Sequence, residues 1–283
     1  MADLPIYELY AIRYATRAAT RSQHFMGGDP HDGPMDMDYF VWMAIHDGRA
    51  VLIDMGFSAE AAQKRRRTFL CDPVESVRLL GIDPDAIEDV VLTHLHYDHA
   101  GNFPSLPNAR FHVQESEMHF ANGRHIRYRY FSSGFEPEDI VSAVRLNFAG
   151  RMMLHNGAVD LTPGIRLVPA PGHSPGQQVV CVHTRRGWVV VASDASHFFE
   201  NIQRHRPYAA AHHIDDMLES FDKVLALAGD LTRVIPGHDP LVMQIYPAAR
   251  PDLQGVVARL DVEPLALPSR KPKAAVDKDK PAP

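Results

Sequence analysis

Apolar and polar positions along the chain divide it into short β-rich runs and helical stretches, which predicts a mixed α/β fold. Residues 39–46 and 49–55 are β-rich runs separated by Asp47-Gly48, a strong signal for a two-residue hairpin. Residues 9–22 are rich in arginine and free of acidic residues, as transit peptides are, but their apolar positions favour an edge strand. An irregular loop is expected at residues 27–34, where Gly, Pro and Asp are dense.

Two helices are predicted after this hairpin. Ser58 can cap a helix over residues 59–70. The segment 72–75 supplies a capping Asp, a proline at the first helical position and an acidic third position, and Gly81 ends that helix. The basic run at residues 64–67 is interpreted as a solvated helix face.

The remaining runs predict further strands and one long helix. Arg185-Arg186-Gly187 joins two of the strands as a second hairpin. Residues 213–228 carry apolar side chains at helical spacing, which indicates an amphipathic helix that covers a sheet. The predicted strands are residues 89–93, 110–114, 165–169, 178–184 and 188–192.

Two segments depart from this pattern. Within residues 115–161, His, Arg, Tyr and Phe occur without clean periodicity, so the segment is either an insertion that covers the site or a helical excursion packed on the sheet. From residue 263 to 283 the Pro, Lys and Ala composition cannot supply a core and predicts a disordered tail. We therefore expect a single domain over residues 1–262.

Composition narrows the class of protein. With 283 residues, 45% of them hydrophobic, the chain can bury a large core, and its formal net charge of −6 gives no general attraction to nucleic acid or to an anionic membrane. Cys71 and Cys181 cannot form a disulfide framework and are expected to be reduced, buried thiols. Neither a membrane span nor the apolar core of a signal peptide is visible, so we expect a cytoplasmic protein.

The densest cluster of potential metal ligands in the chain is His-x-His-x-Asp-His at residues 94–99, directly after the strand predicted at 89–93. Neutral imidazole nitrogens and carboxylate oxygens are ligands that Zn²⁺ and similar ions prefer, and a strand end followed by a loop holds them rigidly. The alternative is a histidine-rich surface loop, which such dense clustering disfavours. This segment is therefore predicted to bind metal.

Three more segments repeat one arrangement, in which a strand ends, a small or turn-forming residue follows and a ligand type stands at the turn. They are Pro171-Gly172-His173, Ala192-Ser193-Asp194 and Pro236-Gly237-His238. Together with residues 94–99 they offer five His and two Asp. That set is enough for two metal ions about 3.5 Å apart, bridged by a carboxylate and a hydroxide.

The residues 94–99 match the hallmark of the metallo-β-lactamase superfamily, and the resemblance covers roughly residues 35–247. It implies an α/β fold in which two mixed β-sheets are flanked by helices as an αββα sandwich. Asp54 resembles the family's early Asp that supports the site. The resemblance implies one metal on His94, His96 and His173, a second on Asp98, His99 and His238, and Asp194 as the bridge between them.

Within the superfamily, the all-histidine set with a bridging Asp, the length and the Gln114-x-x-Glu117 stretch resemble the branch of N-acyl-homoserine lactonases and pyridoxolactonases. Those lactonases place a Tyr three residues after the bridging Asp, where this chain has His197. Its imidazole could donate to a developing oxyanion, or it could pack as a spectator against Phe198 and Phe199. Gln177 also departs from the pattern and is expected to affect packing.

The resemblance implies a dinuclear metal-dependent hydrolase that opens a lactone by attack of a metal-bridging hydroxide. Asp98 and His197 are the candidate catalytic side chains, with Asp98 moving a proton. Residues 35–40 and 119–135 are candidates for the substrate wall, whereas His212 and His213 are expected at the surface or behind the ligands. The expected partner is a small-molecule lactone, with neither nucleic acid nor a membrane.

Other activities share the same metal core. The alternative is a thioesterase of glyoxalase II type, although the short stretch after Tyr246 lacks the basic helical region of those enzymes. β-Lactam and phosphodiester cleavage are disfavoured by the absence of a visible signal peptide and of a large inserted domain. A non-catalytic metal-binding module is the remote alternative, because the ligand set is complete. Zinc is expected, while Fe, Mn and Co suit the same ligands.

Overall fold

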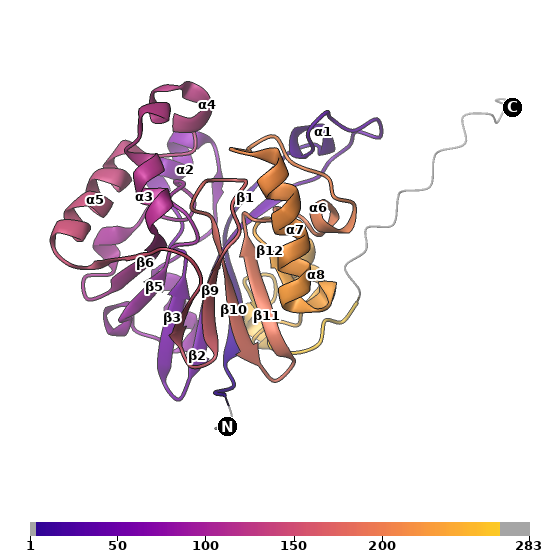
Figure 1. Ribbon diagram of the computed structural model, residues 1–283. Coiled ribbons are helices and arrows are strands. Elements are labelled where there is room, and N and C mark those ends of the chain that lie inside the picture. The colour runs from indigo at the N-terminus through magenta and orange to yellow at the C-terminus, as the bar shows by residue number, and fades with distance from the viewer. Residues whose placement is uncertain (1–3, 267–283) are drawn as a thin grey trace, which may run out of the picture.

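Two β-sheets packed face to face form the centre of the molecule, and helices cover the outer face of each sheet (Figure 1). The computed structural model describes residues 4–266. The predicted αββα sandwich with two mixed sheets is confirmed. Of the helices in the described part of the chain, none is long and apolar enough to cross a membrane.

The larger sheet has the strand order β13-β1-β2-β3-β5-β6-β7, and β4 pairs with β1 beside this path. Strands β3, β5, β6 and β7 run parallel, so their carboxyl ends meet at one edge, whereas β13, β1, β2 and β3 pair antiparallel. The strands are β1 Glu8–Arg17, β2 Met37–His46, β3 Arg49–Ile53, β4 Thr68–Phe69, β5 Asp89–Val91, β6 Arg110–Gln114, β7 Met152–His155 and β13 Val257–Arg259.

The smaller sheet has the order β12-β11-β10-β9-β8, and its β11 and β12 are parallel. Both predicted hairpins are confirmed, because His46 pairs with Arg49 across the first turn and Thr184 with Gly187 across the second. The strand predicted within residues 9–22 is confirmed as β1, but its expected place at an edge is wrong, because β1 pairs with β13 on one side and with β2 on the other. The strands of the smaller sheet are β8 Val159–Thr162, β9 Ile165–Pro169, β10 Gln178–Thr184, β11 Gly187–Ser193 and β12 Val234–Pro236.

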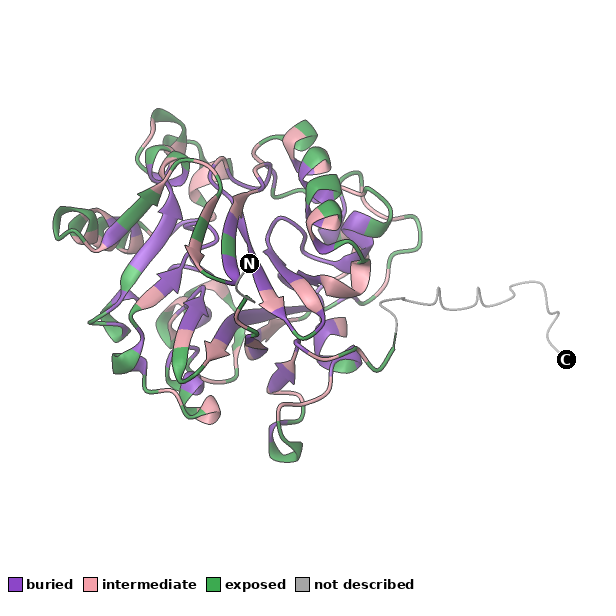
Figure 2. Cartoon of the chain, turned by 60° about the horizontal axis from the view of Figure 1, so that its bottom comes forward, coloured by how far each residue is buried: buried purple, intermediate pink, exposed green. Residues whose placement is uncertain are grey.

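Three apolar layers fill the sandwich, and Figure 2 shows buried residues along the central strands. Successive side chains of a strand point to opposite faces, so Tyr10 and Ile12 of β1 pack under the helices of the larger sheet while Leu9 and Ala11 pack between the sheets. The central strands are therefore buried on both faces, which explains their nearly continuous apolar runs. Helix α7 (Ile214–Ala228) closes the third layer over β10 and β11 and confirms the predicted amphipathic helix.

Two predicted helices end differently from what the sequence suggested. Helix α2 spans Ala59–Arg65 rather than residues 59–70, because Arg66 takes a left-handed φ of 56° and its N–H turns back onto the carbonyls of Ala62 and Gln63. Residues 68 and 69 then pair with β1 as strand β4. The helix predicted after residue 72 is a 3₁₀ segment, Glu75–Leu80, that Gly81 ends as expected.

The remaining helices are short. Residues 115–161 contain three of them together with β7 and β8, and both interpretations of this segment hold in part. Ile140 and Ala143 of α5 pack on the larger sheet, whereas Tyr130 and Phe131 line a cavity described below. These helices are α1 Arg21–His24, α3 Glu115–Ala121, α4 Arg129–Ser132, α5 Pro137–Phe148, α6 Phe199–Gln203 and α8 Leu241–Ile245. Most of the tail predicted at residues 263–283 lies outside the described residues.

Candidate metal centre

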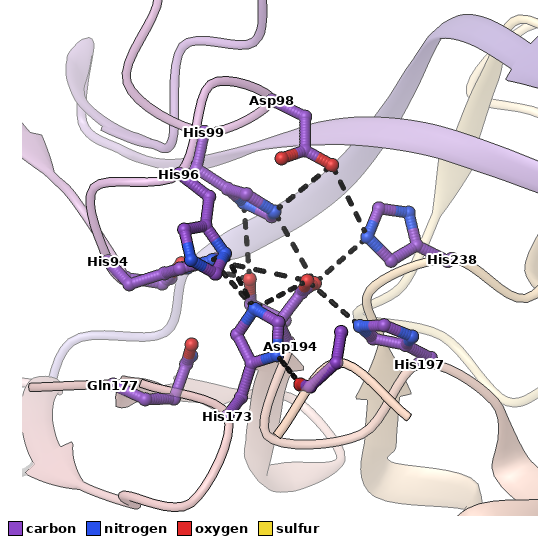
Figure 3. A network of polar contacts seen from close by, with 12 residues as sticks. His94, His96, Asp98, His99, His173, Gln177, Asp194, His197 and His238 are labelled. Carbon is purple, nitrogen blue, oxygen red and sulfur yellow. Dashed lines mark hydrogen bonds and ion pairs between the residues drawn. The ribbon is translucent and has the colours of Figure 1, made fainter. Parts of the chain in front are cut away.

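The seven predicted ligands converge at one edge of the sandwich, where strands of both sheets end (Figure 3). The loop after β5 carries residues 94–99, whereas the smaller sheet supplies one ligand from the β9–β10 loop and one each from the ends of β11 and β12. All seven side chains are buried or nearly so, although His96 belongs to a loop that borders the cavity. The predicted ligands are His94, His96, Asp98, His99, His173, Asp194 and His238.

Three imidazoles form the first group. Nε2 of His173 lies 2.8 Å from Nδ1 of His96 and 3.1 Å from Nε2 of His94, and the last two nitrogens are 3.0 Å apart. Burial lowers the pKa of all three rings, that of His173 to about 4, so they are neutral. Neutral rings are the form that binds metal.

The second group contains Asp98, His99 and His238, and Asp194 stands between the two groups. The Oδ2 atom of Asp98 is 3.8 Å from Nε2 of both His99 and His238. Asp194 turns Oδ1 toward His238, at 3.0 Å, and Oδ2 toward His173, at 3.4 Å. One carboxylate thus faces both groups with different oxygens, which is the geometry of a bridging ligand.

Hydrogen bonds behind the rings determine which nitrogens face inward. His173 Nδ1 donates to the carbonyl of Ala210 at 2.7 Å, and His238 Nδ1 donates to the carbonyl of Asp38 at 2.9 Å. A neutral ring that donates through Nδ1 carries a lone pair on Nε2. In their neutral form these two rings therefore turn acceptor nitrogens inward, which is the arrangement that a metal ion binds.

Asp54 ties the second group to the framework. Its Oδ2 accepts from His99 Nδ1 at 2.7 Å and from the Thr93 hydroxyl at 2.8 Å, and its Oδ1 accepts from the Thr93 N–H at 2.7 Å. The Ser193 hydroxyl, next to Asp194, also donates to Asp54 at 3.2 Å. Asp54 has a left-handed φ of 57° and is fully buried, so the turn after β3 is shaped to present this carboxylate.

Charge also marks the second group as a cation site. Burial opposes a proton on His99, yet the carboxylates of Asp194, Asp54 and Asp98 raise its pKa well above the usual range. Burial likewise opposes a charge on Asp194, whereas His238, His197 and His99 hold its pKa well below the usual range. Asp194 Oδ1 and His99 Nε2 are buried without a hydrogen-bond partner among the described residues. The donor set and these two atoms fit a divalent metal.

His197 lies inside the site, against the bridging carboxylate. Its Nε2 is 3.0 Å from Asp194 Oδ2, and its ring stacks on Tyr208 at a centroid distance of 3.7 Å. Burial lowers the pKa of His197 to about 4. The Tyr208 hydroxyl donates to the backbone carbonyl of Asp194. Sequence reasoning missed Tyr208, because a lone Tyr fourteen residues beyond the ligand carries no local signal.

Glu117 joins the two loops that carry the first histidine group. It is fully buried in α3, where Oε1 accepts from the Leu95 N–H at 3.1 Å and Oε2 from the Gly176 N–H at 2.9 Å. Leu95 stands between two ligands, and Gly176 follows His173 by three residues. In the sequence the Gln114-x-x-Glu117 stretch shows only a resemblance to the lactonase branch. The structure shows that Glu117 contacts both ligand loops.

A cavity of about 370 Å³ opens over the ligands. Met37 and Tyr39 from residues 35–40, and Phe120 and Phe131 from residues 119–135, contribute to its wall as predicted. His212 also lines it, with its ring edge-on to Phe120 at 4.9 Å, whereas His213 is exposed.

The structure also shows where the basic run at residues 64–67, Gln177 and the two cysteines lie. The interpretation of residues 64–67 as a solvated face is wrong for Arg65, which pairs with Glu136 and is only 18% exposed. It is also wrong for Arg67, which is only partly exposed and lines the cavity, since the chain has left the helix there. Gln177 is fully buried and donates to the carbonyl of Gln178 at 3.0 Å, and its effect on packing stays a prediction. Cys181 is buried and Cys71 partly buried, and both are free.

Known proteins resemble this chain over much of its length. An N-acyl homoserine lactonase of Bacillus thuringiensis is 29% identical over 172 residues, which are 60% of this chain and 59% of that protein, so the match spans less than two thirds of that relative. The N-acyl homoserine lactonase AttM of Azorhizobium caulinodans is 25% identical over 262 residues, covering 85% of this chain and 95% of that protein.

The fold agrees with these matches. The crystal structure of a quorum-quenching N-acyl homoserine lactone lactonase superimposes with a TM-score of 0.70 at 23% identity, covering 84% of this chain and 94% of the other. The family model of the metallo-beta-lactamase superfamily matches residues 37–238, a stretch that contains all seven converging side chains. This chain therefore belongs to the metallo-beta-lactamase superfamily.

Proposed function

We propose that this protein is a dinuclear metal-dependent hydrolase that opens lactones. The observation that carries the proposal is Asp194, whose two oxygens face two separate groups of inward-turned ligands. The two relatives named above, which are N-acyl homoserine lactonases, support the lactone as substrate class. The alternative of a glyoxalase II-type thioesterase has no comparable support.

The two metals would be held by side chains from both sheets. His94, His96 and His173 would bind the first, and Asp98, His99 and His238 the second. Asp194 would bridge them. When bound, two such ions supply Lewis acidity and a hydroxide at neutral pH, and zinc suits this set of nitrogen and oxygen ligands.

The chain's own side chains would then position the reaction. His197 lies at the cavity wall, and its Nε2–H donates to Asp194 Oδ2 at 3.0 Å. When metal ions bind the Asp194 oxygens, this N–H would be free to donate to a carbonyl oxygen that gains negative charge. Asp98 also lines the cavity, and its carboxylate can accept the proton that the attacking water loses and deliver it to the leaving alkoxide. The apolar and aromatic wall excludes water from the ring that is opened.

The test combines metal analysis with a substrate panel. Elemental analysis should find close to two metal ions per chain, and a pH-stat should record acid release from acyl-homoserine lactones, aromatic lactones or simple γ- and δ-lactones. Removing the metal with a chelator should abolish turnover, and adding zinc should restore it. S-Lactoylglutathione and a cephalosporin belong in the same panel. Hydrolysis of the thioester alone would replace the lactonase proposal by the thioesterase, and tight metal without any turnover would indicate a binding module.

A further inference from the structure

The cavity over the metal centre contains two arginines that no carboxylate neutralises. Arg17 and Arg67 both line it, and among the described residues neither forms an ion pair. Two other partly buried arginines have carboxylate partners, since Arg13 pairs with Asp38 and Arg65 with Glu136, whereas Arg151 donates to backbone carbonyls. The cavity thus contains two guanidinium groups that no carboxylate contacts within ion-pair distance among the described residues, although Asp98 also lines the cavity.

Arg17 ends strand β1 at the rim of the cavity. Its Nε atom is buried and has no hydrogen-bond partner among the described residues, although a guanidinium offers five N–H donors. Leaving a buried donor unpaired costs free energy, and a charged donor costs more than a neutral one. The terminal Nη groups of Arg17 likewise form no hydrogen bond or ion pair among the described residues, so these donors are available to a ligand with acceptor oxygens in the cavity.

Arg67 is held in place without being neutralised. Its Nε donates to the Tyr97 hydroxyl at 3.1 Å and its Nη1 to the Arg65 carbonyl at 2.8 Å. The guanidinium carbon lies 5.9 Å from the centre of the Tyr39 ring, which in turn packs edge-on against the His238 ring at 5.0 Å. The Tyr39 ring therefore lies between the Arg67 guanidinium and the candidate ligand His238. A small substituted lactone can span this separation.

We propose that Arg17 and Arg67 form a binding subsite for an oxyanion, so that the preferred substrate is a small lactone carrying a carboxylate or phosphate group besides the ring ester. This inference rests on the proposed function. A planar guanidinium matches both oxyanions with paired N–H donors, and a charge-assisted pair is stronger than a neutral one. A cavity of about 370 Å³ suits a compact acidic lactone.

The reaction remains an ordinary ring opening. Hydroxide adds to the ring carbonyl, the bond from that carbon to the ring oxygen breaks, and the alkoxide takes up a proton. One water is consumed, one carboxylate and one hydroxyl are formed, and one proton is released at neutral pH. The substrate's own oxyanion is unchanged and serves only to orient the ring.

The test compares matched substrates. The metal-loaded enzyme is assayed by pH-stat on γ-butyrolactone-γ-carboxylate, on the γ-(phosphooxymethyl) analogue, and on the uncharged γ-carboxamide of similar size. We expect kcat/KM to favour one of the two anionic lactones over the carboxamide by about tenfold or more. In Arg17→Gln and Arg67→Gln this ratio should fall about tenfold, mainly through KM for the anion, and Arg17→Lys should retain part of it. The carboxylate and phosphate arms identify which oxyanion is bound.

Arg49→Gln is the matched control, because that side chain is 85% exposed on the hairpin, is absent from the cavity wall and loses the same charge. Its ratio should equal that of the wild type. Circular dichroism and thermal melting verify that each variant folds. The oxyanion subsite would be overturned if the wild-type enzyme opened the carboxamide and the anions with equal kcat/KM, or if the variants kept the wild-type ratio. Either result would leave the lactonase proposal intact.

A binding measurement separates the two proposals. Isothermal titration calorimetry of glutarate and of inorganic phosphate into the wild-type protein should show an anion affinity that drops about tenfold in Arg17→Gln. If no lactone is opened but this loss of affinity is found, the lactonase proposal fails and the oxyanion subsite stands. If the affinity is equal in both proteins, the subsite is refuted whatever the substrate panel shows.

Discussion

At the scale of single residues, the site depends on side chains that never meet the substrate. Asp54 accepts hydrogen bonds from His99, Thr93 and Ser193, and so connects a candidate ligand with the ends of strands from both sheets. A partner behind a ligand fixes its tautomer and raises its basicity. Sequence reasoning identified Asp54 by resemblance, and the distances explain why an acid is needed there.

Replacing Asp54 should weaken metal binding. The amide of Asp54→Asn has only one acceptor oxygen, so it cannot accept from both the Thr93 N–H and His99. It also lacks the negative charge of the carboxylate. We expect the metal affinity, measured by competition with a chromophoric chelator, to fall about 10- to 100-fold with the fold retained. Asp47→Asn, an exposed turn carboxylate, is the control. Equal affinities in both variants would show that Asp54 is only a turn residue.

His197 offers a test of the catalytic role. We expect His197→Ala to lower kcat about 10- to 100-fold with metal content unchanged, which is the scale of a lost oxyanion donor or somewhat less. His119→Ala, whose side chain is 74% exposed, should leave kcat unchanged. An unaltered kcat in His197→Ala would assign the ring to packing between Asp194 and Tyr208, and lost metal would make it a ligand.

At the scale of elements, helix α3 holds the first group of histidines together. Glu117 accepts an N–H from each of the two ligand loops, and Gly176 lies so close that an added Cβ would be 2.3 Å from the Glu117 nitrogen. The helix and the loop can approach this closely only because residue 176 has no side chain.

Filling this contact should separate the loops. We expect Gly176→Ala to lower the free energy of unfolding by about 1–3 kcal/mol, measured by urea denaturation, because backbone atoms must move apart. Metal affinity should fall in parallel, since His173 belongs to the displaced loop. Gly33→Ala has no atom within 4 Å of its added Cβ and should change neither quantity. Unchanged stability in Gly176→Ala would mean that α3 shifts freely.

At the scale of the whole molecule, stability should depend on pH through Asp139 of α5. Burial, and then the nearby Glu136, raise the pKa of Asp139 from 3.8 to about 7. The folded protein therefore keeps this proton to a higher pH than the unfolded chain. The contribution of Asp139 to the free energy of unfolding thus falls as the pH rises from 3.8 through about 7.

Asp139→Asn removes this titration. Compared with the wild type, the variant should gain stability at about pH 8.5 and gain less at about pH 5, as urea denaturation at both pH values would show. Asp47→Asn, at a side chain 87% exposed, should follow the wild-type curve. If Asp139→Asn also follows it, the carboxyl is solvated and ionised in the folded protein.

Local signals in the sequence are sufficient to predict several elements of this fold and the candidate metal ligands. Hairpins at Asp47-Gly48 and at Arg185 to Gly187 depend on a few adjacent residues, and α7 depends on one apolar stripe. The ligand motif at residues 94–99 lies within one loop, and the other ligands each follow a strand end. Such features are encoded by neighbours in the chain, so they can be predicted without knowing the fold.

Only the tertiary structure decided which distant residues share the site. Helix α2 ended early because Thr68 and Phe69 pair with β1, and that turn brought Arg67 to the cavity. Tyr208 under His197, and Glu117 between two loops, involve partners far apart in sequence. The sequence by itself determined both hairpins, strands β6 and β9, the long helix and the ligand types, because these follow local periodicity. The packing of two sheets determined the bridging geometry and the unpaired cations, because such contacts exist only after the chain has folded.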